Sequence, residues 1–302
     1  MEHNWGIIGH QNIVRFLKNS LVKNRLANTY LFYGIEGLGK AAVAERFALE
    51  IVGKSQSTEL YSLRPEAGKK DIGIDQVREW RRALNLKSFS SDNYKTGIIY
   101  QADRLNVESA NALLKTMEEP PLKTVIIIIA SDRQRLLPTI VSRCVSIRFL
   151  PVPSEEIRKG LSSSVKDKKK LEQAVALANG RPGLAGLLAS DEALLDKHLK
   201  YRKLIYKLFR VDLSQRWQVI SSLLDVLPDL QSRVQASLTF LNHFEAGVRG
   251  LLLANWQLAG EPEAELGSGQ AVKLLKLADN SRRDLAGNIQ PKLVLENLLI
   301  NL

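Results

Sequence analysis

The chain has 302 residues, of which 45% are hydrophobic, so it is long enough for two or three domains with cores of their own. Lys and Arg outnumber Asp and Glu by 43 to 32, and the formal net charge of +11 favours a polyanionic partner such as nucleic acid. The single cysteine, Cys144, excludes an intrachain disulfide and a cysteine-cluster zinc site.

The first predicted elements surround a glycine-rich loop. An apolar run at 30–33 precedes Gly34-Ile35-Glu36-Gly37-Leu38-Gly39-Lys40, and a helical pattern follows it to about Gly53. A strand, such a loop and a helix form a phosphate-binding loop, because backbone N–H groups and the lysine ammonium together bind phosphate oxygens. The candidate nucleotide-binding residues are Gly34, Gly37, Gly39 and Lys40.

The residue after the loop lysine decides whether the loop can also hold a metal ion. The full pattern has Ser or Thr there, whose hydroxyl binds Mg²⁺, but this chain has Ala41, which offers no oxygen. We therefore expect no bound magnesium and only weak binding of ATP or ADP. A glycine-rich turn that binds no nucleotide is the alternative, and the pattern alone leaves it open.

Strands and helices continue to alternate up to residue 150. Apolar runs at 96–100 and 124–130 predict strands, and the second, rich in isoleucine, is typical of a strand buried on both faces of a parallel sheet. Amphipathic patterns predict helices at 75–86 and 107–119. The alternation predicts that residues 1–150 form a doubly wound α/β domain with the phosphate loop at the carboxyl end of a strand.

After residue 150 the sequence shows helical periodicity throughout. Pro151-Val152-Pro153-Ser154 predicts a linker, and a small helical domain is expected at 151–190. Long amphipathic patterns then predict an all-α region at 191–302. Its densest basic segment consists of Lys197, Lys200, Arg202, Lys203, Lys207 and Arg210, with Tyr201 and Tyr206 among them in either a packing or a stacking role.

The most specific pattern is the string at 108–121, Glu-Ser-Ala-Asn-Ala-Leu-Leu-Lys-Thr-Met-Glu-Glu-Pro-Pro. Further motifs occur in a fixed order, namely Ile8-Gly9-His10-Gln11, Ala130-Ser131-Asp132 and Ser142-Arg143-Cys144. Together they resemble the AAA+ subunits of replicative clamp loaders. The resemblance covers about residues 6–150, and beyond them it rests on domain layout alone. It places Ser131 at the position of the family's first sensor.

The resemblance also identifies parts of an ATPase site that this chain lacks. Hydrolysing members end the strand before the 107–119 helix in Asp-Glu-Ala, which supplies the carboxylate pair of metal-assisted phosphoryl transfer. Here the two acidic positions are Tyr100 and Gln101. Asp103 is a poor substitute, because three residues of extended chain move it roughly 10 Å further on. Gly183 stands at the position of the family's later sensor arginine.

Arg143 is the catalytic candidate that the chain retains. In this family the arginine of the Ser-Arg-Cys motif projects into the ATP site of a neighbouring subunit, where an arginine finger accelerates hydrolysis by about 10³ to 10⁵. The chain therefore resembles the non-hydrolysing subunit type of the bacterial DNA polymerase III clamp loader. An interdomain salt bridge is the alternative role for Arg143. That subunit type often carries a cysteine cluster for zinc, which a chain with one cysteine cannot form, so no zinc is expected.

The resemblance implies three domains, an AAA+ P-loop α/β domain at 1–150, a small helical lid at 151–190 and a helical collar at 191–302. The collar would join a ring of about five subunits with gamma/tau-type motors and a delta subunit. The sliding clamp and primer-template DNA would be reached through this complex. The chain would need no cofactor and have no ATPase activity of its own, although it would be part of a DNA-directed DNA polymerase (nucleotidyltransferase) holoenzyme.

Two other functions stay open at this point. An active motor ATPase, of the gamma/tau type or a related AAA+ DNA-remodelling type, would hydrolyse ATP by itself and would depend on Lys40. A nucleic-acid-binding module without a ring partner would bind duplex DNA alone, with a steep dependence on salt. The Tyr100-Gln101 pair argues against the first, and only the net charge supports the second.

The expected location follows from what the sequence does not contain. No apolar run approaches the roughly 20 residues that cross a bilayer, and the N-terminus lacks a signal-peptide pattern. We therefore expect a cytoplasmic protein, associated with the nucleoid through the replication machinery that the resemblance implies.

Overall fold

The computed structural model describes residues 5–53, 59–66, 68–69, 71–86, 94–252 and 266–302. The chain divides into two compact units. The first contains Met1–Ile157 and Gly180–Gly183, and the second contains Arg158–Asn179 and Leu184–Leu302. The finer division at 150 and 190 stays a prediction.

A five-stranded sheet forms the centre of the first unit, in the order β2-β3-β4-β1-β5. Its strands are β1 (Thr29–Tyr33), β2 (Leu60–Leu63), β3 (Lys95–Ile99), β4 (Thr124–Ala130) and β5 (Val145–Arg148). All paired strands run parallel. Every residue of β4 is buried, as its β-branched run predicts. The predicted α/β class, with a parallel sheet in the first half of the chain, is confirmed.

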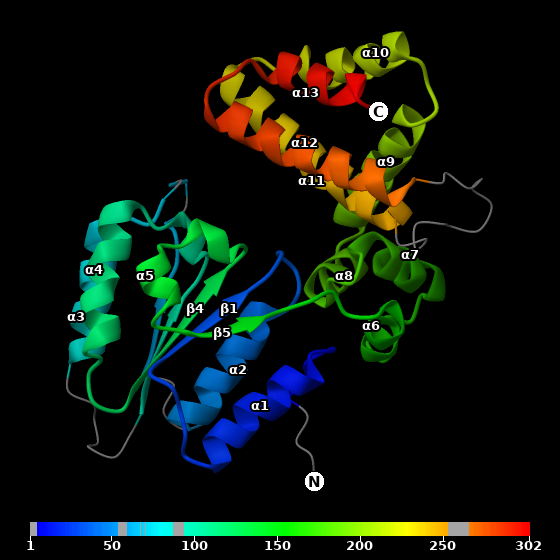
Figure 1. Ribbon diagram of the computed structural model, residues 1–302. Helices are drawn as coiled ribbons and strands as arrows, with labels where there is room; N and C mark the ends of the chain where they lie inside the picture. Colours follow the sequence, from blue (N-terminus) through cyan, green and yellow to red (C-terminus); the bar gives the residue numbers. More distant parts are fainter. Residues whose placement is uncertain (1–4, 54–58, 67, 70, 87–93, 253–265) are drawn as a thin grey trace. The chain divides into compact units, whose positions relative to one another are not determined.

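Helices cover both faces of this sheet, and Figure 1 shows α1 and α2 on one side of the strands and α3 and α4 on the other. The helices of the first half are α1 (Gln11–Val22), α2 (Lys40–Val52), α3 (Ile74–Asn85), α4 (Val107–Glu118) and the short α5 (Pro138–Val141). Phe47 of α2 packs in one core with Phe32 of β1, while Trp80 of α3 packs in a second core with Leu31. Neighbouring residues of β1 thus face opposite helical layers, which is the two-residue period of a strand.

The chain from residue 154 onward is helical, and the described part of the second unit contains no strand. Its helices are α6 (Ser154–Leu161), α7 (Lys168–Ala178), α8 (Pro182–Ser190), α9 (Glu192–Leu208), α10 (Leu213–Leu224), α11 (Leu230–Leu252), α12 (Ser268–Ala286) and α13 (Pro291–Ile300). A small core includes Leu188 and Leu195, and a larger one includes Phe240 and Phe244. Among the described helices, none combines the length and the apolar composition that a bilayer span requires.

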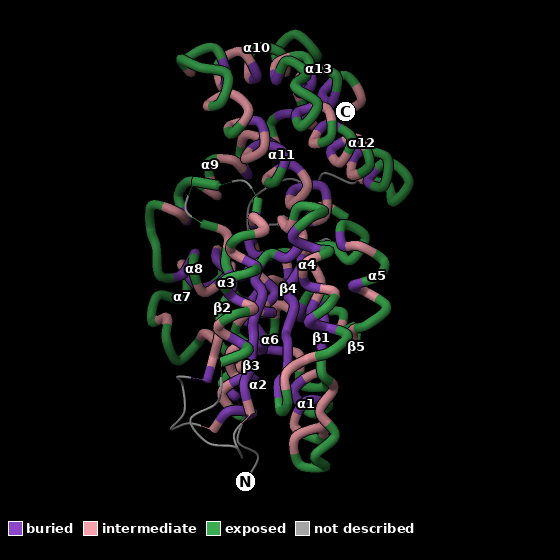
Figure 2. Tube along the Cα trace, turned by 90° about the vertical axis from the view of Figure 1, so that its left-hand side faces the viewer, coloured by how far each residue is buried: buried purple, intermediate pink, exposed green. Residues whose placement is uncertain are grey.

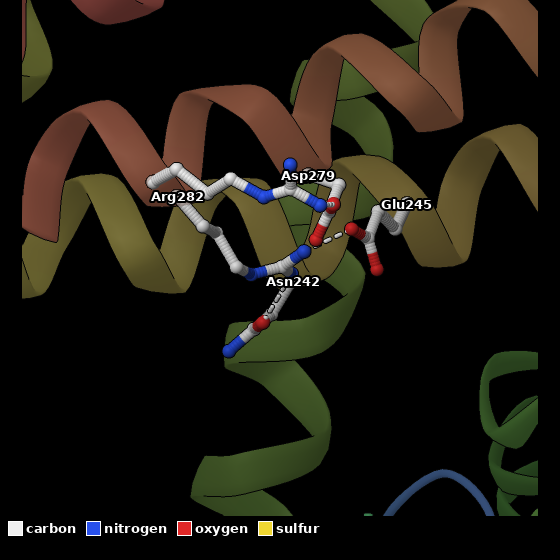
Figure 3. Close-up of polar contacts among 5 residues, drawn as sticks. Asn242, Glu245, Asp279 and Arg282 are labelled. Atoms are coloured by element: carbon white, nitrogen blue, oxygen red, sulfur yellow. Dashed lines mark hydrogen bonds and ion pairs between the residues drawn. The ribbon is translucent and has the colours of Figure 1, made fainter. Parts of the chain in front are cut away.

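Burial follows these cores. In Figure 2 the purple, buried positions run along the central strands and along the inner sides of the long helices α11 and α12. A polar cluster also joins α11 to α12 (Figure 3). Arg282 Nη2 donates to Asn242 Oδ1 at 2.7 Å, and Arg282 Nη1 pairs with Glu245. The Arg282 and Glu245 side chains are only 22% and 18% exposed, so this pair is less screened by solvent than an ordinary surface pair.

Candidate functional site

The register of the sheet brings the predicted site segments to one edge. Tyr33, the last residue of β1, lies beside Ala130, the last residue of β4, and Ile99 at the end of β3 lies beside Ile128. The next segments of the chain, which hold the phosphate loop, Tyr100 and Ser131, therefore leave the sheet at the same end. This edge is where parallel α/β sheets bind their ligands.

Glycines shape the phosphate loop between β1 and α2. Gly34, Gly37 and Gly39 have φ angles of 141°, 82° and 90°, a region that side-chain-bearing residues rarely adopt. A Cβ atom at Gly34 would also lie 2.5 Å from the carbonyl oxygen of Phe149. The helix α2 begins at Lys40 without a side-chain cap, so its first N–H groups face the loop. The predicted strand, loop and helix are all present.

Lys40 is bound to the loop that precedes it. Its Nζ donates to the carbonyl oxygen of Ile35 at 2.7 Å and also to that of Gly34, and the residue is only 7% exposed. Burial lowers the pKa of Lys40 to about 8, while the nearby carboxylates of Glu36 and Asp103 act in the opposite direction. A phosphate in the loop would have to compete with these two carbonyl groups for the ammonium.

Two residues from other parts of the chain bind two further carbonyl groups of the loop. His10 Nε2 donates to the carbonyl oxygen of Leu38 at 2.8 Å, and the backbone N–H of Gly183 donates to that of Gly37 at 2.8 Å. Burial lowers the pKa of His10, which favours the neutral ring. The sequence marked His10 and Gly183 as family positions and did not predict these contacts.

Tyr100, which stands where the resemblance expects a metal-binding aspartate, belongs to a polar cluster with Glu45 and Arg64. Tyr100 Oη donates to Glu45 Oε1 of α2 at 2.6 Å, and the guanidinium of Arg64 lies 3.3 Å from the centroid of the Tyr100 ring. Arg64 Nη2 also pairs with Glu45 Oε1 at 3.2 Å. Burial and the hydrogen bond to Glu45 raise the pKa of Tyr100, so it stays a neutral phenol. The one carboxylate of this cluster is therefore already bound to two partners.

Asp103 and Ser131 form a second polar pair at the same edge. Asp103 lies in a 3₁₀ turn after β3, and Ser131 follows β4 directly. One oxygen of Asp103 accepts from the Ser131 N–H at 3.0 Å, and the other accepts from the Ser131 hydroxyl. Both carboxylate oxygens thus bind the protein itself. In the described part of the chain, no cluster of three or more His, Cys, Asp or Glu residues could hold a metal ion.

Arg143 is the second residue after α5 and precedes β5, whose first residue, Val145, pairs with Tyr30. It therefore lies toward the opposite end of these strands from the phosphate loop, which follows Tyr33. Its Nη1 donates to the carbonyl oxygen of Thr139 at 2.9 Å, and its Nη2 pairs with Glu118 Oε1 at 2.6 Å. The Arg143 side chain is 37% exposed and that of Glu118 is 49% exposed. Both residues belong to the first unit, so this ion pair is not the interdomain salt bridge considered as an alternative.

The structure also distinguishes the buried from the exposed basic residues of α9 and of the turn that follows it. Arg202 is only 3% exposed, whereas the other basic residues of the segment are exposed: Lys197, Lys200, Lys203, Lys207 and Arg210. The Tyr201 ring stacks on His243 with a centroid distance of 4.2 Å, and Tyr206 accepts a hydrogen bond from Arg210 at 2.6 Å. Tyr201 therefore packs within its own unit.

Comparison with known proteins finds similarity to subunits of DNA polymerase III. A family model described as DNA polymerase III, delta subunit, matches residues 54–153. DNA polymerase III subunit delta' of Pseudomonas aeruginosa is 33% identical over 178 residues, which cover 52% of this chain and 54% of that protein. DNA polymerase III subunit tau of Bacillus subtilis is 27% identical over 168 residues, which cover 50% of this chain and 30% of that protein. The chain thus spans about half, or less, of these relatives' length.

One solved structure extends the likeness to the whole fold. A DNA polymerase III gamma subunit-related protein from Thermotoga maritima superposes with a TM-score of 0.50 and 19% identity, over 96% of this chain and 97% of that one. At this identity the likeness concerns the fold alone. It confirms an AAA+ fold followed by a helical C-terminal region.

Proposed function

We propose that this chain is a clamp-loader subunit of the delta-prime type, to which its sequence is similar, and that it hydrolyses no ATP itself but supplies an arginine to a neighbouring subunit's ATP site. The observation that carries the proposal is the position of Arg143. This arginine lies at the surface in the family's Ser-Arg-Cys motif, away from the chain's own phosphate loop, and is 37% exposed. An arginine in this position can reach a ligand held by another protein.

The residues around the chain's own phosphate loop support the non-hydrolysing half of the proposal. Metal-assisted phosphoryl transfer needs a carboxylate for Mg²⁺ and a group that orients the attacking water. Neither Tyr100 nor Gln101 is a carboxylate, and the Gln101 amide oxygen accepts from Arg104 at 2.9 Å. The nearby Glu45 and Asp103 already bind protein groups. We propose that no cofactor is required, that neither magnesium nor zinc binds, and that ATP or ADP binds weakly through Lys40 and the loop.

The proposed partners are motor subunits of the gamma/tau type and a delta subunit in a ring of about five chains. In this scheme the ring loads a sliding clamp on primer-template DNA in the cytoplasm, at the replication machinery. The helical region from 191 onward would be the collar that joins the ring. The net charge of +11 fits a complex that handles DNA.

The first prediction tests Arg143 in the assembled complex. Arg143→Ala should lower DNA-stimulated ATP hydrolysis at the site beside this subunit by about 10³-fold or more, the range of an arginine finger. Arg143→Lys should recover little, because an ammonium does not reproduce the planar guanidinium. The measurement is steady-state ATPase of complexes reconstituted with each variant, in which only the one adjacent motor site is left hydrolysis-competent. Wild-type rates in the Arg143→Ala complex would reject the trans role.

A second candidate function is a motor ATPase, which the tau relative and the retained Lys40 favour. Under this alternative the purified chain would hydrolyse Mg·ATP, and Lys40→Ala would abolish the activity. Under our proposal the purified chain shows no turnover above that of Lys40→Ala. The two functions are therefore separated by an ATPase assay on the chain alone.

A further inference from the structure

We infer that Glu118 is a positioning residue for Arg143, holding its guanidinium in the orientation that a neighbouring subunit's triphosphate would meet. The inference rests on the proposed trans role of Arg143 and adds a second residue to it. Glu118 is the last residue of α4 and lies at the end of the string that carries the family resemblance. Neither the sequence patterns nor the resemblance assigned it a function.

The geometry fixes the guanidinium through two short contacts, and Nη1 also lies 3.5 Å from Ser142 Oγ. Glu118 Oε1 holds Nη2 at 2.6 Å, and the carbonyl oxygen of Thr139 holds Nη1 at 2.9 Å. Ser142 Oγ donates to the same Thr139 carbonyl at 3.1 Å, which keeps the turn after α5 in place. A guanidinium has five N–H donors in one plane, so two fixed contacts define that plane and leave donors for a phosphate.

The location of Glu118 argues against a role in helix stability. The carboxyl end of a helix carries a partial negative charge, so an acidic residue in the last turn is unfavourable by itself. Two acids stand there, Glu118 at the end of α4 and Glu119 at its C-cap. The positive charge of Arg143 offsets the repulsion between the Glu118 carboxylate and the carboxyl end of the helix. Glu118 is therefore unfavourable for α4 itself, and it stands where its carboxylate contacts Arg143, the exposed arginine of the Ser-Arg-Cys motif.

The benefit of the contact is reduced motion of a long side chain. An unrestrained arginine samples many rotamers, and a group that must meet a transition state loses rate when it is poorly oriented. One anchor remains if Glu118 is removed, because the Thr139 carbonyl is part of the backbone. Loss of Glu118 should therefore weaken the action of Arg143 without abolishing it.

The test uses the assembled complex with Glu118→Ala and, as a matched control, Glu119→Ala. Both substitutions remove one acid from the same helix end, and both positions are exposed. Glu118→Ala should lower kcat for ATP about two- to five-fold with KM unchanged, the range that an exposed ion pair supports. Glu119→Ala should match the wild type. In the Arg143→Ala background, Glu118→Ala should have no further effect, whereas a general loss of structure would lower the rate in both backgrounds.

Each outcome either supports or overturns the positioning role of Glu118. A kcat for Glu118→Ala equal to or above that of Glu119→Ala overturns the positioning role, and so does an equal fall in the Arg143→Ala background. If Arg143→Ala itself leaves the complex at the wild-type rate, the proposed trans function fails and this inference fails with it. A fall with Arg143→Ala but none with Glu118→Ala rejects the positioning role alone.

Discussion

At the scale of single residues, the phosphate loop is held by contacts within the protein. Lys40 binds the carbonyl groups of Gly34 and Ile35, and His10 binds that of Leu38. In a loop that serves a nucleotide, the lysine ammonium is reserved for the phosphates. Here its charge is buried, and burial is what lowers its pKa to about 8.

This pKa predicts how stability depends on pH. The folded chain releases the Lys40 proton at pH about 8, while the unfolded chain keeps it to pH about 10.4, so the unfolded state binds more protons between these values. The contribution of Lys40 to the free energy of unfolding should therefore increase as pH rises from 8 to 10. The wild type should gain about 2 kcal/mol over this window relative to Lys40→Met.

The measurement is denaturant unfolding of both chains at pH 7, 8, 9 and 10. The exposed Lys203→Met serves as a control, and its difference from the wild type should stay constant across the series. A Lys40→Met difference that is also constant with pH would show that the ammonium is not buried in the folded chain.

At the scale of elements, Gly183 shows how the start of α8 limits the phosphate loop. Its N–H binds the Gly37 carbonyl, and a Cβ atom at this position would lie 3.0 Å from the same oxygen. That distance is tight, and the neighbour is backbone rather than a flexible side chain. A larger side chain at this position would press on the loop.

Gly183→Ala should therefore lower the free energy of unfolding by about 1 kcal/mol or more. Gly186, in the same helix, has open space where its Cβ would stand, so Gly186→Ala should be neutral or stabilise by about 0.5 to 1 kcal/mol. Thermal unfolding of the two variants beside the wild type measures both effects. If both substitutions shift the unfolding temperature equally and in the same direction, the close approach of Gly183 to the Gly37 carbonyl does not affect stability.

Local sequence patterns predicted the strands and helices that have a long apolar run or a clear helical periodicity. The isoleucine run gave β4 with its bounds, 124–130, and the predicted helices at 75–86 and 107–119 differ from α3 and α4 by one residue at most. The strand β5 was not predicted, because most of its four residues are exposed and leave no apolar run. Short edge strands are defined by their neighbours, and β5 exists because it pairs with β1.

The sequence predicted which residues belong to the site, but it did not predict which residues they contact. The sequence identified Tyr100, Ser131 and Arg143 as the positions that matter. It could not show that Tyr100 bonds Glu45, that Ser131 bonds Asp103 or that Arg143 bonds Glu118. These partners lie 25 or more residues apart in the chain, and no periodic pattern links positions at such distances. The acidic end of α4 was the one local signal, since it contradicts the helix dipole.

At the scale of the whole molecule, each of the two units has buried clusters of its own. Phe47 lies in a cluster of the first unit and Phe244 in a cluster of the second, and both are fully buried. Units with separate cores can unfold in separate steps, because losing one core leaves the contacts of the other intact.

Phe47→Ala and Phe244→Ala should therefore each destabilise one step of unfolding by about 3 to 5 kcal/mol and leave the other step almost unchanged. Denaturant unfolding of the full chain, followed by far-UV circular dichroism and tryptophan fluorescence, resolves the two steps. A single transition that both variants shift equally would show instead that the units unfold as one.

Asp103 and Ser131 connect the ends of two neighbouring strands through the protein's own side chains. The Ser131 hydroxyl already donates to Asp103, so a phosphate near Ser131 would have to compete with that carboxylate. Because this contact involves no nucleotide, we expect the carboxyl ends of β3 and β4 to keep their positions in the presence of ATP or ADP. In the proposed clamp loader, the conformational changes that accompany ATP hydrolysis would then occur in the motor subunits. This chain would offer those subunits a binding surface that does not change during the cycle.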